Sequence, residues 1–429
     1  MRDGKVAALS SCGSWLTGVL AILVIGGAVL CTTARAEWSQ FRGPNRDGKA
    51  VEASGLLHEW PENGPEHLWT SEKLGFGFSS VSVGDGLLYL TGLEGKEGFI
   101  YALTRDGELE WKTSYGKAWT GAHPGTRTTP TYRNGRLYIM SGHGKAACYD
   151  AENGNEIWAV DTQDKFGGRQ IRWGITESPL VLDDKVIFSP GGENAGVVAL
   201  NPDNGQTVWV CQGVNDKSGY CSPIVIERGG KKIIVQLMAK TLIGIQADSG
   251  ELLWRVEREP EPKYNIQAVH PVYADGKLYV TCGYGGRRGQ MFAVSEDGTS
   301  VSRGWGDAEL DCHHGGLVLL DGYIYGSSHV NNRNQWLCMN LDNGDVAAKL
   351  RGVGKGAVVH ADGKLYTYGE NGGVGLVEPG PDSFHLVSSF RLSDMSDGRG
   401  PYWAHPSISE GRLYLRHGGY IFAFDISAN

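Results

Sequence analysis

The sequence has few long apolar runs, and the main one lies at its N-terminus. Residues 15–30 are apolar, follow a basic start at Arg2 and Lys5, and are followed by Ala34-Arg35-Ala36, an A-x-A cleavage pattern. This order predicts a signal peptide over residues 1–36 and export to the periplasm or the cell exterior. A retained anchor is the alternative, because the run is only slightly shorter than a membrane span. After cleavage, no stable transmembrane span is expected.

Positive charge is also scarce. The chain has 40 Lys and Arg residues against 48 Asp and Glu residues, a net charge of −8, and loss of residues 1–36 would bring the net charge to −10. So acidic a protein is a poor candidate for binding nucleic acid or an anionic membrane surface.

The motifs of several enzyme classes are missing. There is no P-loop, H-E-x-x-H, G-x-S-x-G or protein-kinase motif set, and neither C-x-x-C-H nor a pair of adjacent cysteines occurs. Cys312-His313-His314 resembles part of a metal site. However, neighbouring side chains of an extended strand point to opposite faces, and no second ligand cluster has zinc spacing. A structural role is favoured for the triplet, and no metal is predicted.

Glycine and aromatic residues are abundant instead. The 64 glycines are about twice the usual share, and there are 13 Trp and 18 Tyr residues. This composition favours many short strands joined by turns. A two-residue turn, usually followed by an apolar-x-aromatic strand, recurs along the chain, and most copies are type I′ hairpin signals. The turns are Asp85-Gly86, Asn134-Gly135, Asp183-Asp184, Gly229-Gly230, Asp275-Gly276, Asp321-Gly322, Asp362-Gly363 and Glu410-Gly411.

A second hairpin follows in each repeat. Its clearest copies begin at a small residue and end at a tryptophan ten positions later: Cys148 to Trp158, Ala199 to Trp209 and Gly244 to Trp254. Two hairpins make a four-stranded blade, and blades of this size stack radially to bury their faces. Cys148 and Cys338 occupy the small position and are predicted to be buried free thiols. Cys211 and Cys221, which flank a nine-residue loop, are predicted to form a disulfide.

The ring is predicted to close on itself. The last repeat lacks its fourth strand, whereas Glu66–Thr70 is an orphan strand with a suitable tryptophan. Pairing the two removes an exposed sheet edge. We therefore expect an all-β chain: an eight-bladed β-propeller of four-stranded antiparallel blades over residues 66–429, closed by an N-terminal strand. An N-terminal extension occupies residues 37–65.

The tryptophan repeats, together with the opening Trp38 to Gly48, resemble the PQQ-like (pyrroloquinoline-quinone repeat) β-propeller family. The resemblance implies the propeller fold. It leaves two activities open, because the family includes quinoprotein dehydrogenases that bind PQQ and Ca²⁺ and a non-enzymatic lipoprotein that assists outer-membrane β-barrel assembly. No residue of this chain maps onto a family Ca²⁺ ligand or catalytic Asp.

The loops that lead from one blade to the next are rich in aromatic rings and arginine. They are expected to meet at one mouth of the central channel, where Arg127, Glu177, His270 and His405 would form a polar funnel. The predicted binding residues are Arg127, Arg172, Trp173, Glu177, Tyr220, His270, His313, Trp403 and His405. The sequence favours a binding or scaffold protein of the cell envelope that recognises a polypeptide or glycan, without a cofactor. The alternative is a PQQ- and Ca²⁺-dependent alcohol or sugar oxidoreductase.

Overall fold

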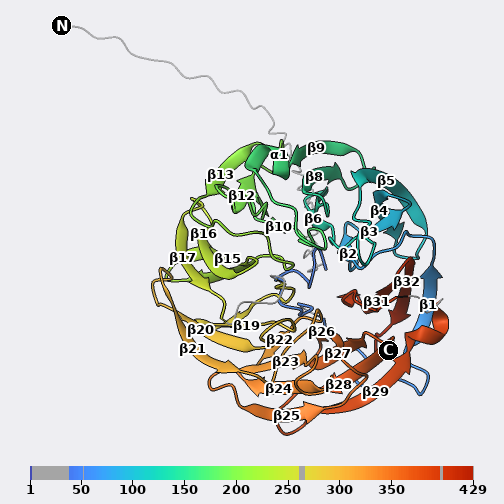
Figure 1. The fold of residues 1–429 in the computed structure, drawn as a ribbon. Helices are drawn as coiled ribbons and strands as arrows, with labels where there is room; N and C mark the ends of the chain where they lie inside the picture. The colour runs from blue at the N-terminus through green and yellow to red at the C-terminus, as the bar shows by residue number, and fades with distance from the viewer. Residues whose placement is uncertain (2–37, 52, 260–265, 397–399, 429) are drawn as a thin grey trace. The chain divides into compact units, whose positions relative to one another are not determined.

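A computed structural model describes Met1 and residues 38–51, 53–259, 266–396 and 400–428. The predicted signal peptide therefore lies outside the described residues, apart from Met1. All the strands belong to one unit, Ala36–Asn429. Within this unit, eight antiparallel four-stranded sheets follow one another round a ring (Figure 1). The predicted eight-bladed propeller is confirmed.

Blades 1 to 7 each consist of four consecutive strands, and blade 8 combines the last three strands with the first. Blade 1 contains β2 (Ser82–Gly84), β3 (Leu87–Glu94), β4 (Glu97–Thr104) and β5 (Leu109–Lys117). Blade 2 contains β6 (Thr131–Arg133), β7 (Arg136–Met140), β8 (Lys145–Asp150) and β9 (Glu156–Asp161). Blade 3 contains β10 (Leu180–Val181), β11 (Val186–Phe188), β12 (Val197–Leu200) and β13 (Thr207–Cys211). Blade 4 contains β14 (Ile224–Arg228), β15 (Lys231–Leu237), β16 (Thr241–Gln246) and β17 (Leu252–Glu257).

The second half of the ring repeats this plan. Blade 5 contains β18 (Val272–Ala274), β19 (Lys277–Thr281), β20 (Gly289–Val294) and β21 (Val301–Asp307). Blade 6 contains β22 (Val318–Leu320), β23 (Tyr323–Ser327), β24 (Trp336–Asn340) and β25 (Val346–Leu350). Blade 7 contains β26 (Gly356–Ala361), β27 (Lys364–Gly369), β28 (Gly373–Glu378) and β29 (His385–Arg391). Blade 8 contains β30 (Ser407–Ser409), β31 (Arg412–His417), β32 (Tyr420–Asp425) and β1 (Glu66–Ser71).

Helical structure is sparse. The described part of the chain contains the short helix α1 (Thr162–Phe166) and the 3-10 turn η2 (Leu392–Met395). None of its helices has the length and apolar character needed to span a membrane.

The predicted hairpin turns are present in seven of the eight blades. Their two central residues both have positive φ, as at Asp85 (47°) and Gly86 (77°), which is the geometry of a type I′ turn. The exception is Asp183-Asp184, where neither residue has a positive φ. Local turn chemistry thus sets the register of most inner hairpins.

The recurring tryptophan joins most of the blades that carry it to the next blade in the ring. In five blades its indole N–H donates to a backbone carbonyl in the neighbouring blade, and its ring packs on a turn glycine of that blade. At Gly205 (φ 68°) a Cβ atom would lie 2.8 Å from the Trp158 ring, so only glycine allows this contact. The hydrogen bonds join Trp69 to Arg105 (2.9 Å), Trp111 to Ala151 (3.1 Å), Trp158 to Pro202 (2.9 Å), Trp209 to Ala247 (3.1 Å) and Trp305 to Leu341 (3.0 Å).

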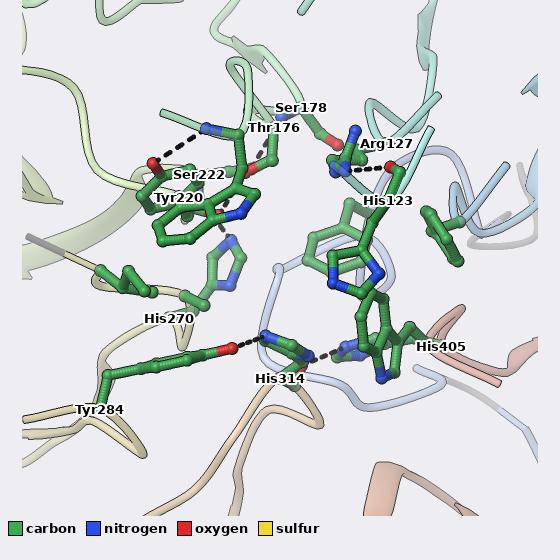
Figure 2. Close-up of a pocket in the computed structure, with 16 residues that line it drawn as sticks. His123, Arg127, Thr176, Ser178, Tyr220, Ser222, His270, Tyr284, His314 and His405 are labelled. Atoms are coloured by element: carbon green, nitrogen blue, oxygen red, sulfur yellow. Dashed lines mark hydrogen bonds between the residues drawn. The ribbon is translucent and has the colours of Figure 1, made fainter. Parts of the chain in front are cut away.

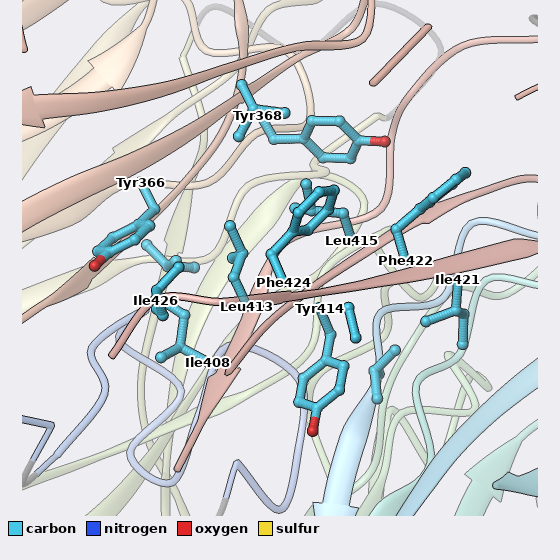
Figure 3. Close-up of a cluster of buried hydrophobic side chains, with 14 of the residues drawn as sticks. Tyr366, Tyr368, Ile408, Leu413, Tyr414, Leu415, Ile421, Phe422, Phe424 and Ile426 are labelled. Atoms are coloured by element: carbon cyan, nitrogen blue, oxygen red, sulfur yellow. The ribbon is translucent and has the colours of Figure 1, made fainter. Parts of the chain in front are cut away.

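The ring closes where the sequence predicts. Strand β1 pairs antiparallel with β32, with Glu66 opposite Asp425 and Ser71 opposite Ile421. Beside this seam, buried side chains of β31 and β32 pack with Tyr366 and Tyr368 of β27 in one hydrophobic cluster (Figure 3). Pairing the first strand with the last leaves neither with an open edge on that side.

The predicted free thiols are confirmed, and the predicted disulfide is wrong. Cys148, Cys338, Cys211 and Cys221 are all buried and unbridged. Cys211 packs among residues of blades 3 and 4, whereas Cys221 packs among residues of blades 4 and 5. The two thiols therefore belong to the cores on opposite sides of blade 4, although only nine residues separate them in sequence.

Candidate functional site

The N-terminal segment 38–49 lies inside the ring (Figure 1). It contacts the inner strands of five blades, or the residues next to them, and these blades lie on both sides of the channel. The contacts pair Trp38 with Val83, Ser39 with Tyr132, Arg46 with Ser178, Arg42 with Leu317 and Val358, and Lys49 with His360. A segment that reaches all of them must cross the central channel. Sequence analysis placed these residues in an extension and missed this role.

Two buried arginines anchor this segment. Arg42 is 1% exposed, and its guanidinium donates to the carbonyls of Leu317 and Val358 and to Nδ1 of His405 (3.1 Å). Arg46 is 3% exposed and donates to the Ser178 carbonyl at 2.6 Å. Burial lowers the pKa of each guanidinium to about 10, so both remain charged at neutral pH.

A pocket of about 290 Å³ lies against this segment, and Figure 2 shows the residues that line it. The Phe41 ring forms part of its lining and lies 5.1 Å from the His270 ring and 4.8 Å from the His405 ring, measured between centroids. Aromatic rings, imidazoles and hydroxyl groups make up most of the wall. The lining residues are Phe41, Phe78, His123, Arg127, Trp173, Thr176, Ser178, Tyr220, Ser222, Ile266, Ala268, His270, Tyr284, His314, Trp403 and His405.

The buried imidazoles in this wall are neutral. Burial lowers the pKa of His270 well below its ordinary value and that of His405 to about 3, and the charge of Arg42 adds to both effects. Nε2 of His270 accepts from the backbone N–H of Ser222 at 2.9 Å. His405 accepts from Arg42 at Nδ1 and donates from Nε2 to the His314 carbonyl at 2.9 Å.

Arg127 supplies positive charge to the pocket. Its guanidinium donates to the carbonyls of Gly125 (2.9 Å) and His123 (2.6 Å) and lies over the Phe78 ring. Burial lowers its pKa to about 10, so it is charged at neutral pH. Because these partners are neutral, the charge can still attract an anionic group of a ligand.

Glu177 lies outside the pocket lining. It is 0% exposed, and its carboxylate accepts from the backbone N–H of Ser189 at 3.1 Å. Burial raises its pKa to about 7, although the charge of Arg46 opposes this shift. The predicted funnel therefore contains Arg127, His270 and His405 but not Glu177.

A cluster of polar rings borders the pocket at Tyr284 and His314. The Tyr284 hydroxyl lies 2.8 Å from Nε2 of His313 and 2.8 Å from Nε2 of His314, and the two imidazoles stack with centroids 3.7 Å apart. The alternation of side chains assumed for Cys312-His313-His314 does not hold, because the triplet lies outside any strand. Cys312 alone points into the core, where burial raises the pKa of its thiol to about 12.

The same cluster contains a lysine and a carboxylate. Lys355 Nζ lies 3.2 Å from Nδ1 of His313, 2.7 Å from Nδ1 of His329 and 3.1 Å from a carboxylate oxygen of Glu370. The other oxygen of Glu370 lies 2.9 Å from Nδ1 of His313. His329 stacks on His313 with centroids 4.2 Å apart.

The structure brings six of the nine predicted binding residues into one pocket: Arg127, Trp173, Tyr220, His270, Trp403 and His405. Arg172 lies over the Trp173 ring (4.9 Å), and His313 lies behind Tyr284. Sequence reasoning missed Phe41, Phe78 and Tyr284 in the lining, and it also missed Glu370. Phe41 belongs to the opening segment that carries the family resemblance, which is the one signal that could have drawn attention to it.

The sequence pattern of the family described as outer membrane protein assembly factor BamB matches residues 96–350. This chain belongs to that family. Among individual proteins, it is 28% identical to the quinoprotein alcohol dehydrogenase PedH of Pseudomonas putida over 177 residues, which cover 39% of this chain and 28% of that protein. It is 26% identical to the outer membrane protein assembly factor BamB of Shewanella oneidensis over 156 residues, which cover 34% of this chain and 36% of that protein. The matched part of the chain thus spans about a third of the length of these curated relatives.

Solved structures of both kinds share the fold. BamB from Moraxella catarrhalis has a TM-score of 0.58 at 14% identity, covering 85% of this chain and 98% of that one. The quinohemoprotein alcohol dehydrogenase from Comamonas testosteroni has a TM-score of 0.65 at 11% identity, covering 93% and 82%. These likenesses concern the fold and leave the activity open.

The quinoprotein relatives make PQQ with Ca²⁺ the group to test against this pocket. Ca²⁺ takes six to eight oxygen ligands, and carboxylates are prominent among them. None of the described residues that line the pocket is Asp or Glu. Glu177 is turned to Ser189, and Glu370 is held by Lys355 and His313. This set of side chains does not fit a Ca²⁺-supported quinone, so no chemical step is assigned to one.

Proposed function

We propose that this chain is a binding protein of the cell envelope and that the pocket at the channel mouth recognises a segment of a polypeptide or a glycan. The observation that carries the proposal is the pocket itself. Segment 38–49 crosses the channel, so loops from several blades surround a cavity with Phe41 in its lining. Loops held on a rigid scaffold are common carriers of binding function.

The chemistry of the wall indicates the kind of group that would bind. The Trp403 ring contacts the rings of Phe78 and His123, with centroids 5.1 Å and 5.2 Å away, and Trp173 and Tyr220 form a second aromatic pair. Such rings stack on the apolar faces of sugars or on apolar side chains. Arg127 adds a charge that would pair with a carboxylate. An acidic peptide segment or an acidic sugar satisfies both features.

Two further observations support a role in the envelope. The N-terminal residues 1–36 have the pattern of a signal peptide. The family to which the chain belongs is described as outer membrane protein assembly factor BamB. An exported protein of this family would meet polypeptides and glycans in the same compartment.

The second candidate is a PQQ- and Ca²⁺-dependent oxidoreductase, favoured by the likeness to quinoprotein dehydrogenases. The side chains of the pocket count against it, because Ca²⁺ would find no carboxylate in the described lining. The absence of adjacent cysteines in the sequence points the same way. Binding is therefore the better-supported function.

The test uses the chain without residues 1–36, applied to arrays of acidic and neutral peptides and of acidic and neutral glycans. We expect a set of acidic probes whose binding falls at least tenfold in Trp403→Ala and in Arg127→Met. Ile157→Ala, at an exposed position on β9, is the control and should bind as the parent does. Probes that bind all three variants equally would refute the pocket as the site. Dye-linked alcohol or sugar oxidation on addition of PQQ and Ca²⁺ would favour the second candidate.

A further inference from the structure

We propose that His313, His314 and Glu370 form a binding site for a divalent transition metal that prefers imidazole ligands, such as Zn²⁺ or Cu²⁺. One potential ligand atom from each of the three residues lies within 4.8 Å of the others. Two imidazoles and a carboxylate are a ligand set that Zn²⁺ and Cu²⁺ accept, whereas Ca²⁺ and Mg²⁺ prefer oxygen. The proposal does not depend on what the pocket binds.

The hydrogen bonds of the two imidazoles indicate which atoms are available. Tyr284 contacts Nε2 of both rings at 2.8 Å, which leaves the two Nδ1 atoms to face a metal. Nδ1 of His313 lies 2.9 Å from a Glu370 oxygen, close to the separation of two ligands on one ion. Nδ1 of His314 is buried and has no hydrogen-bond partner among the described residues. A metal would satisfy this nitrogen, and Tyr284 would orient both rings from behind.

A cation already lies beside these atoms. The ammonium group of Lys355 contacts Nδ1 of His313 and an oxygen of Glu370, and it also contacts Nδ1 of His329. The cluster is thus arranged around positive charge. A metal ion that took the Nδ1 atom and the carboxylate would displace the lysine from them. Lys355 is therefore a competitor of the metal rather than a ligand.

The site can be reached from the pocket. His314 and Tyr284 belong to the pocket lining, and the side chains of His313 and Glu370 keep 13% and 18% of their surface exposed. With three protein ligands, the ion would keep an open position, as metal sites that act on a bound molecule do. A ligand in the pocket could then take that position.

In the experiment, metal-free protein is titrated with Zn²⁺ and, separately, with Cu²⁺, and binding is measured by isothermal titration calorimetry. We expect one ion per chain, at least tenfold weaker binding in His314→Gln and in Glu370→Gln, and tighter binding in Lys355→Met. His385→Gln, at an exposed position on β29, is the matched control and should bind as the parent does. In the Cu²⁺ complex, the electron paramagnetic resonance spectrum should show coupling to two ring nitrogens in the parent and to one in His314→Gln.

Thermal unfolding without metal identifies variants that fail to fold. His314→Gln and Glu370→Gln keep a side chain of similar shape to limit this risk. Three outcomes would overturn the proposal. The first is no stoichiometric binding in either the parent or folded Lys355→Met. The second is equal affinity in the parent, His314→Gln and His385→Gln. The third is weaker binding in Lys355→Met, which would mean that the lysine only holds the cluster together.

Discussion

Glu177 should make the stability of this propeller depend on pH in an unusual direction. Burial raises the pKa of its carboxyl from 4.5 to about 7 in the folded protein. Between these values the folded chain holds a proton that the unfolded chain has lost. The free energy of unfolding should therefore fall as the pH rises from about 4.5 to about 7, because ionising the buried carboxyl costs free energy.

The size of the effect follows from the shift in pKa. A shift of this size corresponds to about 3 kcal/mol between the two protonation states. The substitution Glu177→Gln keeps the shape and an oxygen that can accept from Ser189, and it cannot ionise. Relative to the parent, the variant should gain about 2–3 kcal/mol of stability between about pH 5 and about pH 8.

Urea unfolding of both proteins at these two pH values measures the difference directly. Comparing the variant with the parent cancels the contributions of the buried histidines, which titrate in both proteins. Glu193→Gln, at an exposed position between β11 and β12, is the control and should show no such gain. If the free energies of unfolding of the parent and of Glu177→Gln change with pH in parallel, then ionising the buried Glu177 carboxyl does not cost the free energy proposed here.

Three further predictions concern the scaffold. Trp158→Phe removes the hydrogen bond to the Pro202 carbonyl and should lower the free energy of unfolding, measured by urea denaturation, by about 1 kcal/mol. Trp158→Ala also removes the ring and should lower the free energy of unfolding by about 3–5 kcal/mol. Equal effects of the two variants would contradict the docking role of the ring. Arg42→Met leaves backbone carbonyls unpaired in the channel, so trypsin should cleave segment 38–49 faster than in the parent, and an unchanged rate would contradict its anchoring role. Alkylation of the unfolded chain without reductant should label both Cys211 and Cys221, and a protected pair would restore the disulfide.

The blade count could be predicted from the sequence because local interactions determine each blade. The ring closure could be predicted because the last repeat lacks a fourth strand, and β1, far from it in sequence, supplies one. A turn such as Asp85-Gly86 adopts positive φ through its own side chains, and this defines a hairpin wherever it recurs. A tryptophan ten residues after a small residue indicates the fourth strand, and the rings of Trp158 and Trp209 dock on the next blade. The turn and the docking residues of one repeat lie within about 50 residues of one another and form a single blade, so the sequence pattern of a repeat indicates its structure directly.

The site depended on contacts that no local pattern contains. Arg127 and His405 are far apart in sequence and line the same pocket only because the ring closes. Glu177 sits just before an inner strand, as predicted, yet the fold turns it into the protein, where burial raises its pKa.

Segment 38–49 and the polar cluster show the same limit. Phe41 reaches the pocket because the channel had room for a segment that five blades could bind, which depends on the finished ring. His313 and Glu370 meet because blades 6 and 7 place their loops side by side. The sequence alone determined the repeating unit, since each blade's turns and docking residues are encoded locally. The tertiary structure decided the site, since only closure of the ring sets the distances between residues from different blades.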